Sequence, residues 1–298
     1  MDITYVRLVS LVAVAAIYML FDVFNRRNIP NIVVYGTFGY GLFLTILYLN
    51  VVSLVSIGIA GVILALGYPV YRAGQIGAAD IFEFAVLSMI MPLQMNYPIP
   101  ATNIPTPFIL SLFINTGIVA ILVVPIYYIP LRYRAAHHIL DNVKRSDAVR
   151  SVILAAVYMF FIAFLVLFAG ISTGGFALMT ALMVASIAIT LFQRPITMSM
   201  IRYVTVSRME SGDIIALNLM PQSMISGLQH LVKHFDKLVT DQLRAEMSRK
   251  HVTMRLPVYK NAMPFAIAIL GGTIVTILFG NLLFAALLRV PYTLTLLP

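Results

Sequence analysis

The sequence contains no cysteine, and only 10% of its 298 residues are charged. The absence of cysteine excludes disulfides, thiolate metal sites and a cysteine nucleophile. The scarcity of charge is the stronger constraint, because soluble domains carry about 25% charged residues. Since 61% of the residues are hydrophobic, polar groups could not cover the apolar surface in water. We therefore expect an all-α polytopic membrane protein.

Stretches long and apolar enough to span a membrane, which takes about 20 residues, recur along the chain. They cover residues 5–24, 31–49, 51–71, 80–97, 107–129, 150–169, 175–192 and 264–288. The first stretch is longer than the ~7–15-residue core of a signal peptide, and no small-residue cleavage site follows it. We therefore expect it to be a membrane helix of the mature protein. Asn50 and Ser53 predict a tight turn between the second and third spans, and the prolines of 98–107 predict an extended loop.

The basic residues lie on one side of this layout, as the positive-inside rule requires. With the N-terminus outside, the inner segments are residues 25–30, 72–79, 130–150 and 193–263. These segments hold 18 of the 20 Lys and Arg residues, and only Arg7 and Arg289 fall on the other side. The net charge of +9 is thus explained by topology rather than by nucleic-acid binding. The expected topology has eight spans, with the N-terminus and the C-terminus outside.

The spans divide the chain into four regions. These are spans one to five in 1–129, an inner loop with spans six and seven in 130–192, an inner segment in 193–263, and the last span in 264–298. In the inner segment, apolar residues recur at helical spacing from Leu228 to Leu243, which predicts an amphipathic helix. We therefore expect this segment to be a cytosolic helical insertion. Such a helix either packs on a small cytosolic domain or lies along the inner membrane face.

Three acidic residues, Asp22, Asp80 and Glu83, lie at the ends of apolar segments. Acids in such positions are costly and tend to be functional, and the topology puts all three at the inner interface. Two carboxylates brought together at the edge of a low-dielectric layer cannot both ionise cheaply, so they share one proton. One member can then activate water while the other protonates a carbonyl oxygen. We predict Asp22 and Asp80 as this catalytic pair, which needs neither a metal nor a cofactor.

Each of these acids also has a purely structural interpretation. Asp80 could be the N-cap of the fourth span, and Asp22 could pair with Arg26 or Arg27. Glu83 lies about one helical turn from Asp80 and could be a capping or helix-pairing residue.

The residues around the two aspartates resemble known motifs. Asp22 is followed by Ile29, Pro30 and Asn31, and Asp80 is preceded by Gly77-Ala78-Ala79. These strings resemble the two active-site motifs of prepilin and preflagellin peptidases, which are polytopic aspartic proteases of the GxGD type. The resemblance covers about the first 90 residues, and it implies that Asp22 and Asp80 are catalytic, with Gly77, Ala79, Ile29, Pro30 and Asn31 in support. Ala79 stands where the motif has its second glycine, and it fits if its φ is negative.

The resemblance also implies a substrate class. Peptidases of this family remove the short basic leader, a class III signal peptide, from pilin and archaellin precursors at the cytoplasmic face of the plasma membrane. Residues 1–129 would then be the catalytic core, and a basic leader residue would pair with Glu83. The partners would be these precursors and membrane lipids. Bifunctional bacterial relatives carry a methyltransferase with a cysteine-rich loop, and the lack of cysteine argues against that second activity.

Other classes of function stay open. A secondary transporter or an ion- or proton-coupled channel would use Asp22 and Asp80 as ion sites, although no internal repeat is evident. A presenilin-like protease would carry a Pro-Ala-Leu motif, which the sequence lacks. A non-catalytic assembly protein would follow if Ala79 had inactivated the site.

Two weaker patterns have ordinary explanations. His137 and His138 could suggest a metal site, but adjacent histidines point in different directions on a helix, so we expect a solvated inner loop. A small-residue pattern predicts close helix packing at Gly36, Gly39, Gly41, Gly271 and Gly272.

Overall fold

The structure is a computed structural model that describes residues 3–25, 28–91, 107–135, 143–232, 235–260 and 263–287. Several features named above lie outside these residues. They are the basic pair Arg26 and Arg27, most of the proline-rich loop 98–107, and the histidines His137 and His138.

Each predicted span contains a helix. The helices are α1 (Ile3–Phe24), α2 (Asn31–Leu47), α3 (Val51–Arg72), α4 (Ala78–Ile90), α5 (Phe108–Ala135), α6 (Arg145–Phe164), α7 (Thr173–Leu191) and α11 (Phe265–Phe279). A short π-helical turn, Leu165–Ala169, continues α6. Among the described residues, five helices are long and apolar enough to cross a membrane, namely α1, α3, α5, α6 with its extension, and α7. This set of helices is that of a multi-pass membrane protein.

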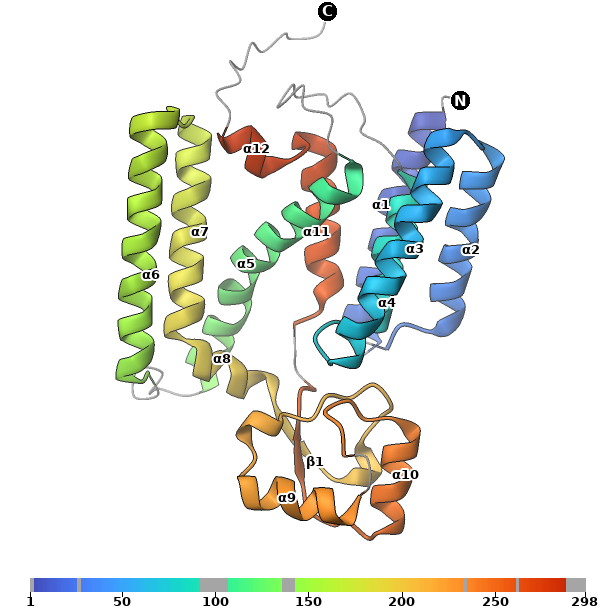
Figure 1. The fold of residues 1–298 in the computed structure, drawn as a ribbon, viewed down its shortest axis with the longest axis vertical. Helices are drawn as coiled ribbons and strands as arrows, with labels where there is room; N and C mark the ends of the chain where they lie inside the picture. Colours follow the sequence, from blue (N-terminus) through green and yellow to red (C-terminus); the bar gives the residue numbers. More distant parts are fainter. Residues whose placement is uncertain are drawn as a thin grey trace, which may run out of the picture.

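The helices form two groups that α5 connects (Figure 1). The α6–α7 pair stands on one side, and α1 to α4 stand on the other, with α11 between them and α5 crossing obliquely. Helix α4 packs against α1, α2, α3 and α5, and nine of its 13 residues are buried. It ends at Ile90, and residues 92–97 of the predicted span 80–97 lie outside the described residues.

The predicted last span, 264–288, is not one continuous helix. Helix α11 ends at Phe279, and a short helix α12 (Leu282–Leu287) turns away from it (Figure 1). Gly280 adopts a positive φ of 67° at the break. The side-chain amide of Asn115 donates to the Gly280 carbonyl at 2.6 Å, and its oxygen accepts the Leu282 N–H at 3.1 Å. Since Asn115 satisfies the backbone groups freed by the break, the chain can turn inside an apolar environment.

The predicted glycine packing is correct for α11 and only partly correct for α2. A Cβ on Gly272 would lie 2.7 Å from the Thr116 backbone and still closer to Thr116 Oγ1, so α11 and α5 are in very close contact there. Gly271 and Gly41 also face neighbouring side chains. A methyl group added to Gly36 or Gly39 would meet nothing within 4 Å, so the packing prediction is wrong for these two.

A small polar domain, defined here as residues 201–260, follows α8 (Gln193–Met200) and precedes α11. Its elements are β1 (Arg202–Val204), two 3₁₀ turns (Val206–Arg208 and Leu217–Leu219), α9 (Gln222–Leu231), α10 (Asp241–Arg249) and β2 (Leu256–Val258). Strands β1 and β2 pair antiparallel, with Tyr203 opposite Pro257. The predicted helical insertion thus includes a small sheet. The domain lies beyond the end of the bundle where α1 and α3 finish and α4 begins (Figure 1).

The predicted amphipathic helix from Leu228 to Leu243 is wrong as a single element. Helix α9 ends at Leu231 and α10 begins at Asp241. Residues between them pair with another segment instead, since the Ile215 N–H donates to the Lys237 carbonyl at 2.8 Å. Most of the apolar residues are nevertheless buried in the core of the small domain, including Leu228, Val232, Val239 and Leu243. Leu231 is an exception, since it is 46% exposed.

Candidate active site

Asp22 lies in the last turn of α1, and only 7% of its surface is exposed. Its Oδ2 accepts the backbone N–H of Ala266 at 3.2 Å. Ala266 is in the first turn of α11, where backbone N–H groups have no partner inside the helix. Asp22 therefore joins the end of α1 to the beginning of α11, which is distant in sequence.

Asp80 lies in the first turn of α4. Its Oδ2 accepts the N–H of Gly77 at 3.2 Å, and Gly77 itself is the N-cap. The interpretation of Asp80 as the N-cap is therefore wrong by three positions, although its carboxylate does bind the chain just before the helix. A Cβ on Gly77 would lie only 2.8 Å from Asp80 Oδ2, so the glycine leaves the space that this carboxylate occupies.

Ala79 is the second residue of α4, and it packs against the apolar core of the bundle. Within the described residues, His251 is the one non-glycine residue with a positive φ. The φ of Ala79 is thus negative, which an alanine adopts without strain. The departure from the glycine of the motif is therefore compatible with this backbone.

The two aspartates and Glu83 form one acidic cluster. Asp80 is close enough to Asp22 for their charges to repel each other, and Glu83 is within electrostatic range of both. Glu83 is 0% exposed, and in the described part of the chain neither of its carboxylate oxygens has a hydrogen-bond partner. An unpaired buried carboxyl group is costly to the fold. Glu83 is therefore a candidate for function rather than for stability.

The remaining motif residues shape the corner between α1 and α2. Ile29 is buried in the core of the bundle. Pro30 is the extended residue before α2, and its carbonyl accepts the N–H groups of Val33 and Val34. Asn31 is the first residue of α2. These residues support the corner that follows Asp22.

Two groups near the acids were not predicted from the sequence. Tyr18 is fully buried, lies one turn before Asp22, and is within electrostatic range of Asp80 and Glu83. Its hydroxyl shares a hydrogen bond of 3.0 Å with Thr37 Oγ1. The i, i+4 spacing from Asp22 could have indicated Tyr18. The amide of Ala266 carries no signal in the sequence, because any residue other than proline has this group.

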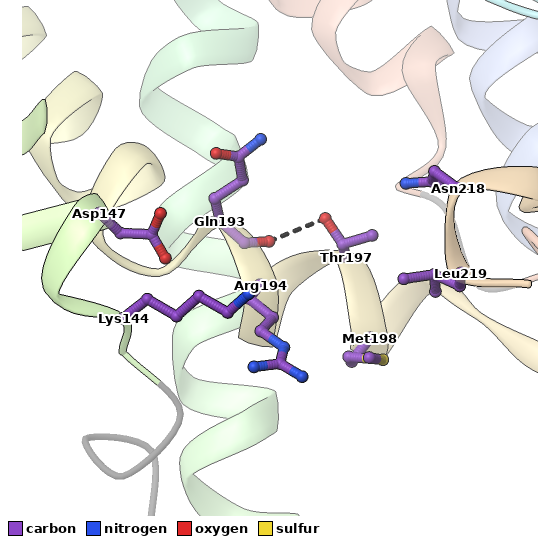
Figure 2. A pocket seen from close by; sticks show the side chains of 8 residues that line it. All are labelled: Lys144, Asp147, Gln193, Arg194, Thr197, Met198, Asn218 and Leu219. Atoms are coloured by element: carbon purple, nitrogen blue, oxygen red, sulfur yellow. Dashed lines mark hydrogen bonds between the residues drawn. The ribbon is translucent and has the colours of Figure 1, made fainter. Parts of the chain in front are cut away.

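A separate cavity of about 230 Å³ lies where α6, α8 and the small domain meet (Figure 2). Its polar lining includes Lys144, Asp147, Gln193, Arg194, Thr197 and Asn218. Both signs of charge are present, and none of the three acids of the cluster lines it, so it defines no single ligand class. In the part of the chain that the structure describes, no group of three His, Cys, Asp or Glu side chains is arranged to hold a metal ion.

Comparisons with protein-family models, with characterised proteins and with solved structures gave no match to this chain.

Proposed function

We propose that this protein is a membrane aspartic endopeptidase that removes the short basic leader from pilin or archaellin precursors. The observation that carries the proposal is the meeting of Asp22 and Asp80. They come from different helices, yet they lie within electrostatic range of each other at one end of the bundle. Each also accepts a backbone N–H, Asp22 from Ala266 and Asp80 from Gly77. The resemblance of the flanking residues to prepilin and preflagellin peptidases supports the same activity.

The proposed topology has eight spans with the N-terminus outside, in the plasma membrane. It follows from the concentration of Lys and Arg in the inner segments, which hold 18 of 20. The small domain would then be cytoplasmic, and the acidic cluster would face the cytoplasm. Helix α4, with 13 residues, would be a short span enclosed by its neighbours. In this topology the proposed cleavage site lies at the membrane surface from which a basic leader would emerge.

The two carboxyl groups can perform hydrolysis without a cofactor. The ionised member takes a proton from a water molecule while the water oxygen bonds to the scissile carbonyl carbon. The protonated member gives its proton to the carbonyl oxygen. In the second step the C–N bond breaks, and the leaving nitrogen receives a proton from the carboxyl group that first acted as base. As the C=O bond re-forms, one hydroxyl of the tetrahedral intermediate returns its proton to the other carboxylate. The protonation of the pair is then ready for another cycle.

Glu83 is the candidate for recognising the leader. It lies one turn deeper in α4 than Asp80, and it has no partner among the described residues. A Lys or Arg of the substrate would supply the missing hydrogen bonds and the opposite charge. Exchange of Glu83 for Gln should therefore raise KM for basic leaders more than it lowers kcat.

The direct test is co-expression with a candidate precursor, with leader removal followed on a gel. We expect Asp22→Asn and Asp80→Asn each to reduce cleavage by about 10³-fold or more, because each removes one of the two proton carriers. Asp147→Asn is the matched control, since it neutralises an acid outside the cluster and should leave cleavage unchanged. Retained cleavage in both aspartate variants would exclude the protease.

A second candidate, a proton-coupled transporter or channel, is favoured by one observation. Glu83 is a carboxyl group inside the helix bundle with no partner among the described residues, and such groups occur in proton relays. Proteoliposomes with an internal pH dye distinguish the two functions. A proton flux that Glu83→Gln abolishes, without leader cleavage, would support transport instead.

A further inference from the structure

The small domain lies beside the connection between α3 and α4, which leads to Asp80. A Cβ on Gly74 would lie 3.4 to 3.6 Å from three side-chain carbons of Ile214, which is ordinary van der Waals distance. Gly74 belongs to the connection between α3 and α4 and has a positive φ of 64°. Three residues later, Gly77 donates its N–H to Asp80. The side chain of Ile214 therefore faces Gly74, in the connection that leads to one aspartate.

The same part of the small domain is hydrogen-bonded to the segment before α11, the helix whose Ala266 N–H binds Asp22. The carbonyl of Ile214 accepts the Tyr259 N–H at 3.0 Å. Beside it, Lys260 Nζ forms an ion pair with Asp213 Oδ2 at 2.9 Å. Helix α11 begins at Phe265, only a few residues further along the chain, and its Ala266 N–H binds Asp22.

The segment around Ile214 is held firmly within its own domain. Ile214 forms a β-bridge with Leu238, and Ile215 forms one with Val258. Ile215 and Val258 are completely buried in the core of the domain. A packed core transmits displacement rather than absorbing it, so the contacts at Gly74 and at Tyr259 belong to one stiff unit.

We propose that the small domain is a brace that sets the separation of Asp22 and Asp80, with Ile214 as a positioning residue. This inference rests on the proposed protease function, because the separation matters only if both carboxyl groups act on one water molecule. Displacement of a catalytic group by about 1 Å can cost about 10²-fold in rate. A brace outside the membrane part would keep the two helix ends aligned while a substrate enters between them.

The kinetic test compares Ile214→Ala with Leu231→Ala, in full-length protein purified in detergent. Ile214→Ala removes the three side-chain carbons that face Gly74, and we expect kcat to fall about tenfold or more while KM changes less than about twofold. The pH profile of kcat should also shift, because the two carboxyl groups are coupled through their separation. Ile214→Val keeps two of those carbons and should restore most of the rate. Leu231 belongs to the same domain but is 46% exposed, so Leu231→Ala leaves the core intact and should cause neither kinetic change.

Hydrogen exchange tests the brace without any enzymatic activity. We expect Ile214→Ala to increase amide exchange in residues 73–80 and 265–267, and Leu231→Ala to leave both segments unchanged. If the wild-type protein cleaves no precursor, the protease proposal fails while the exchange still tests the mechanical coupling. Unchanged exchange in Ile214→Ala overturns the brace, and so does faster exchange with an unaltered kcat in an active enzyme. Should Ile214→Ala not fold, the milder Ile214→Val is compared with wild type by the same exchange measurement.

Discussion

Helices α4 and α6 are both apolar, but they have opposite surroundings. Nine of the 13 residues of α4 are buried, and Glu83 is among them. In α6 the buried residues are Asp147, Ser151 and Ile162, while apolar side chains such as Val152 and Phe160 are exposed. An exposed apolar surface of this kind suits contact with lipid. The two helices keep their buried carboxyl groups in different places: Asp147 lies in the first turn of α6, whereas Glu83 lies within the enclosed helix α4.

The largest expected effect is on the free energy of unfolding, when a leucine is replaced by alanine in each of the two helices. Leu87 in α4 is completely buried, whereas Leu167, in the extension of α6, is 76% exposed. We expect Leu87→Ala to lower the free energy of unfolding by about 2–5 kcal/mol, because it leaves a cavity. Leu167→Ala should change it by less than about 0.5 kcal/mol. Unfolding of both variants in mixed micelles measures the difference, and equal losses would show that α4 is not the enclosed helix.

The next comparison concerns glycines that face protein or open space. Gly272→Ala would push a methyl group into the Thr116 backbone, so we expect a loss of about 1–3 kcal/mol from overpacking. Gly36→Ala meets nothing and should instead stabilise α2 by about 0.5–1 kcal/mol. Thermal unfolding in detergent measures both effects. A neutral Gly272→Ala would contradict the close contact between α11 and α5.

Substitutions of Glu83 test whether this buried carboxyl group lowers the stability of the protein while serving its function. We expect Glu83→Met to raise the free energy of unfolding by about 1–3 kcal/mol, because it removes an unsatisfied buried polar group. The same variant should lose recognition of basic leaders. Glu83→Gln is the control, since it keeps a buried polar group of similar size and should change stability little. If Glu83→Met is less stable than wild type, the carboxyl group has a structural partner after all.

The smallest expected effect is at Ala79. Because this residue is helical, Ala79→Gly should lower the free energy of unfolding by only about 0.5–1 kcal/mol and leave cleavage within about twofold. Ala78→Gly, one position earlier in the same turn, is the matched control. A large gain in cleavage for Ala79→Gly alone would mean that the motif needs a backbone conformation that alanine resists.

Local patterns of the sequence were enough to locate most helices. Each predicted span contains a helix, and the tight turn at Asn50 is present, with its side chain capping α3. The predicted ends of helices were least accurate where contacts with distant segments determine them. The break at Gly280 depends on Asn115 of another helix, and the segment after Leu231 forms a β-bridge with Ile214 through Leu238. No window of neighbouring residues contains these partners.

The candidate site also contains groups that the sequence predicted and groups that only the structure revealed. Asp22, Asp80 and Glu83 were visible from the sequence, because acids at the ends of apolar segments are rare and costly. Tyr18 and the amide of Ala266 were not, since one is a common aromatic and the other is a backbone group.

The sequence alone determined that this is a membrane protein with three misplaced acids, because hydropathy and charge are properties of each residue and its neighbours. Only the tertiary structure decided that the acids form one cluster, that Glu83 is enclosed without a described partner, and that the small domain touches the loop before Asp80. These facts depend on contacts between segments far apart along the chain. Such contacts are selected by packing and by the pairing of backbone groups, neither of which a local pattern contains.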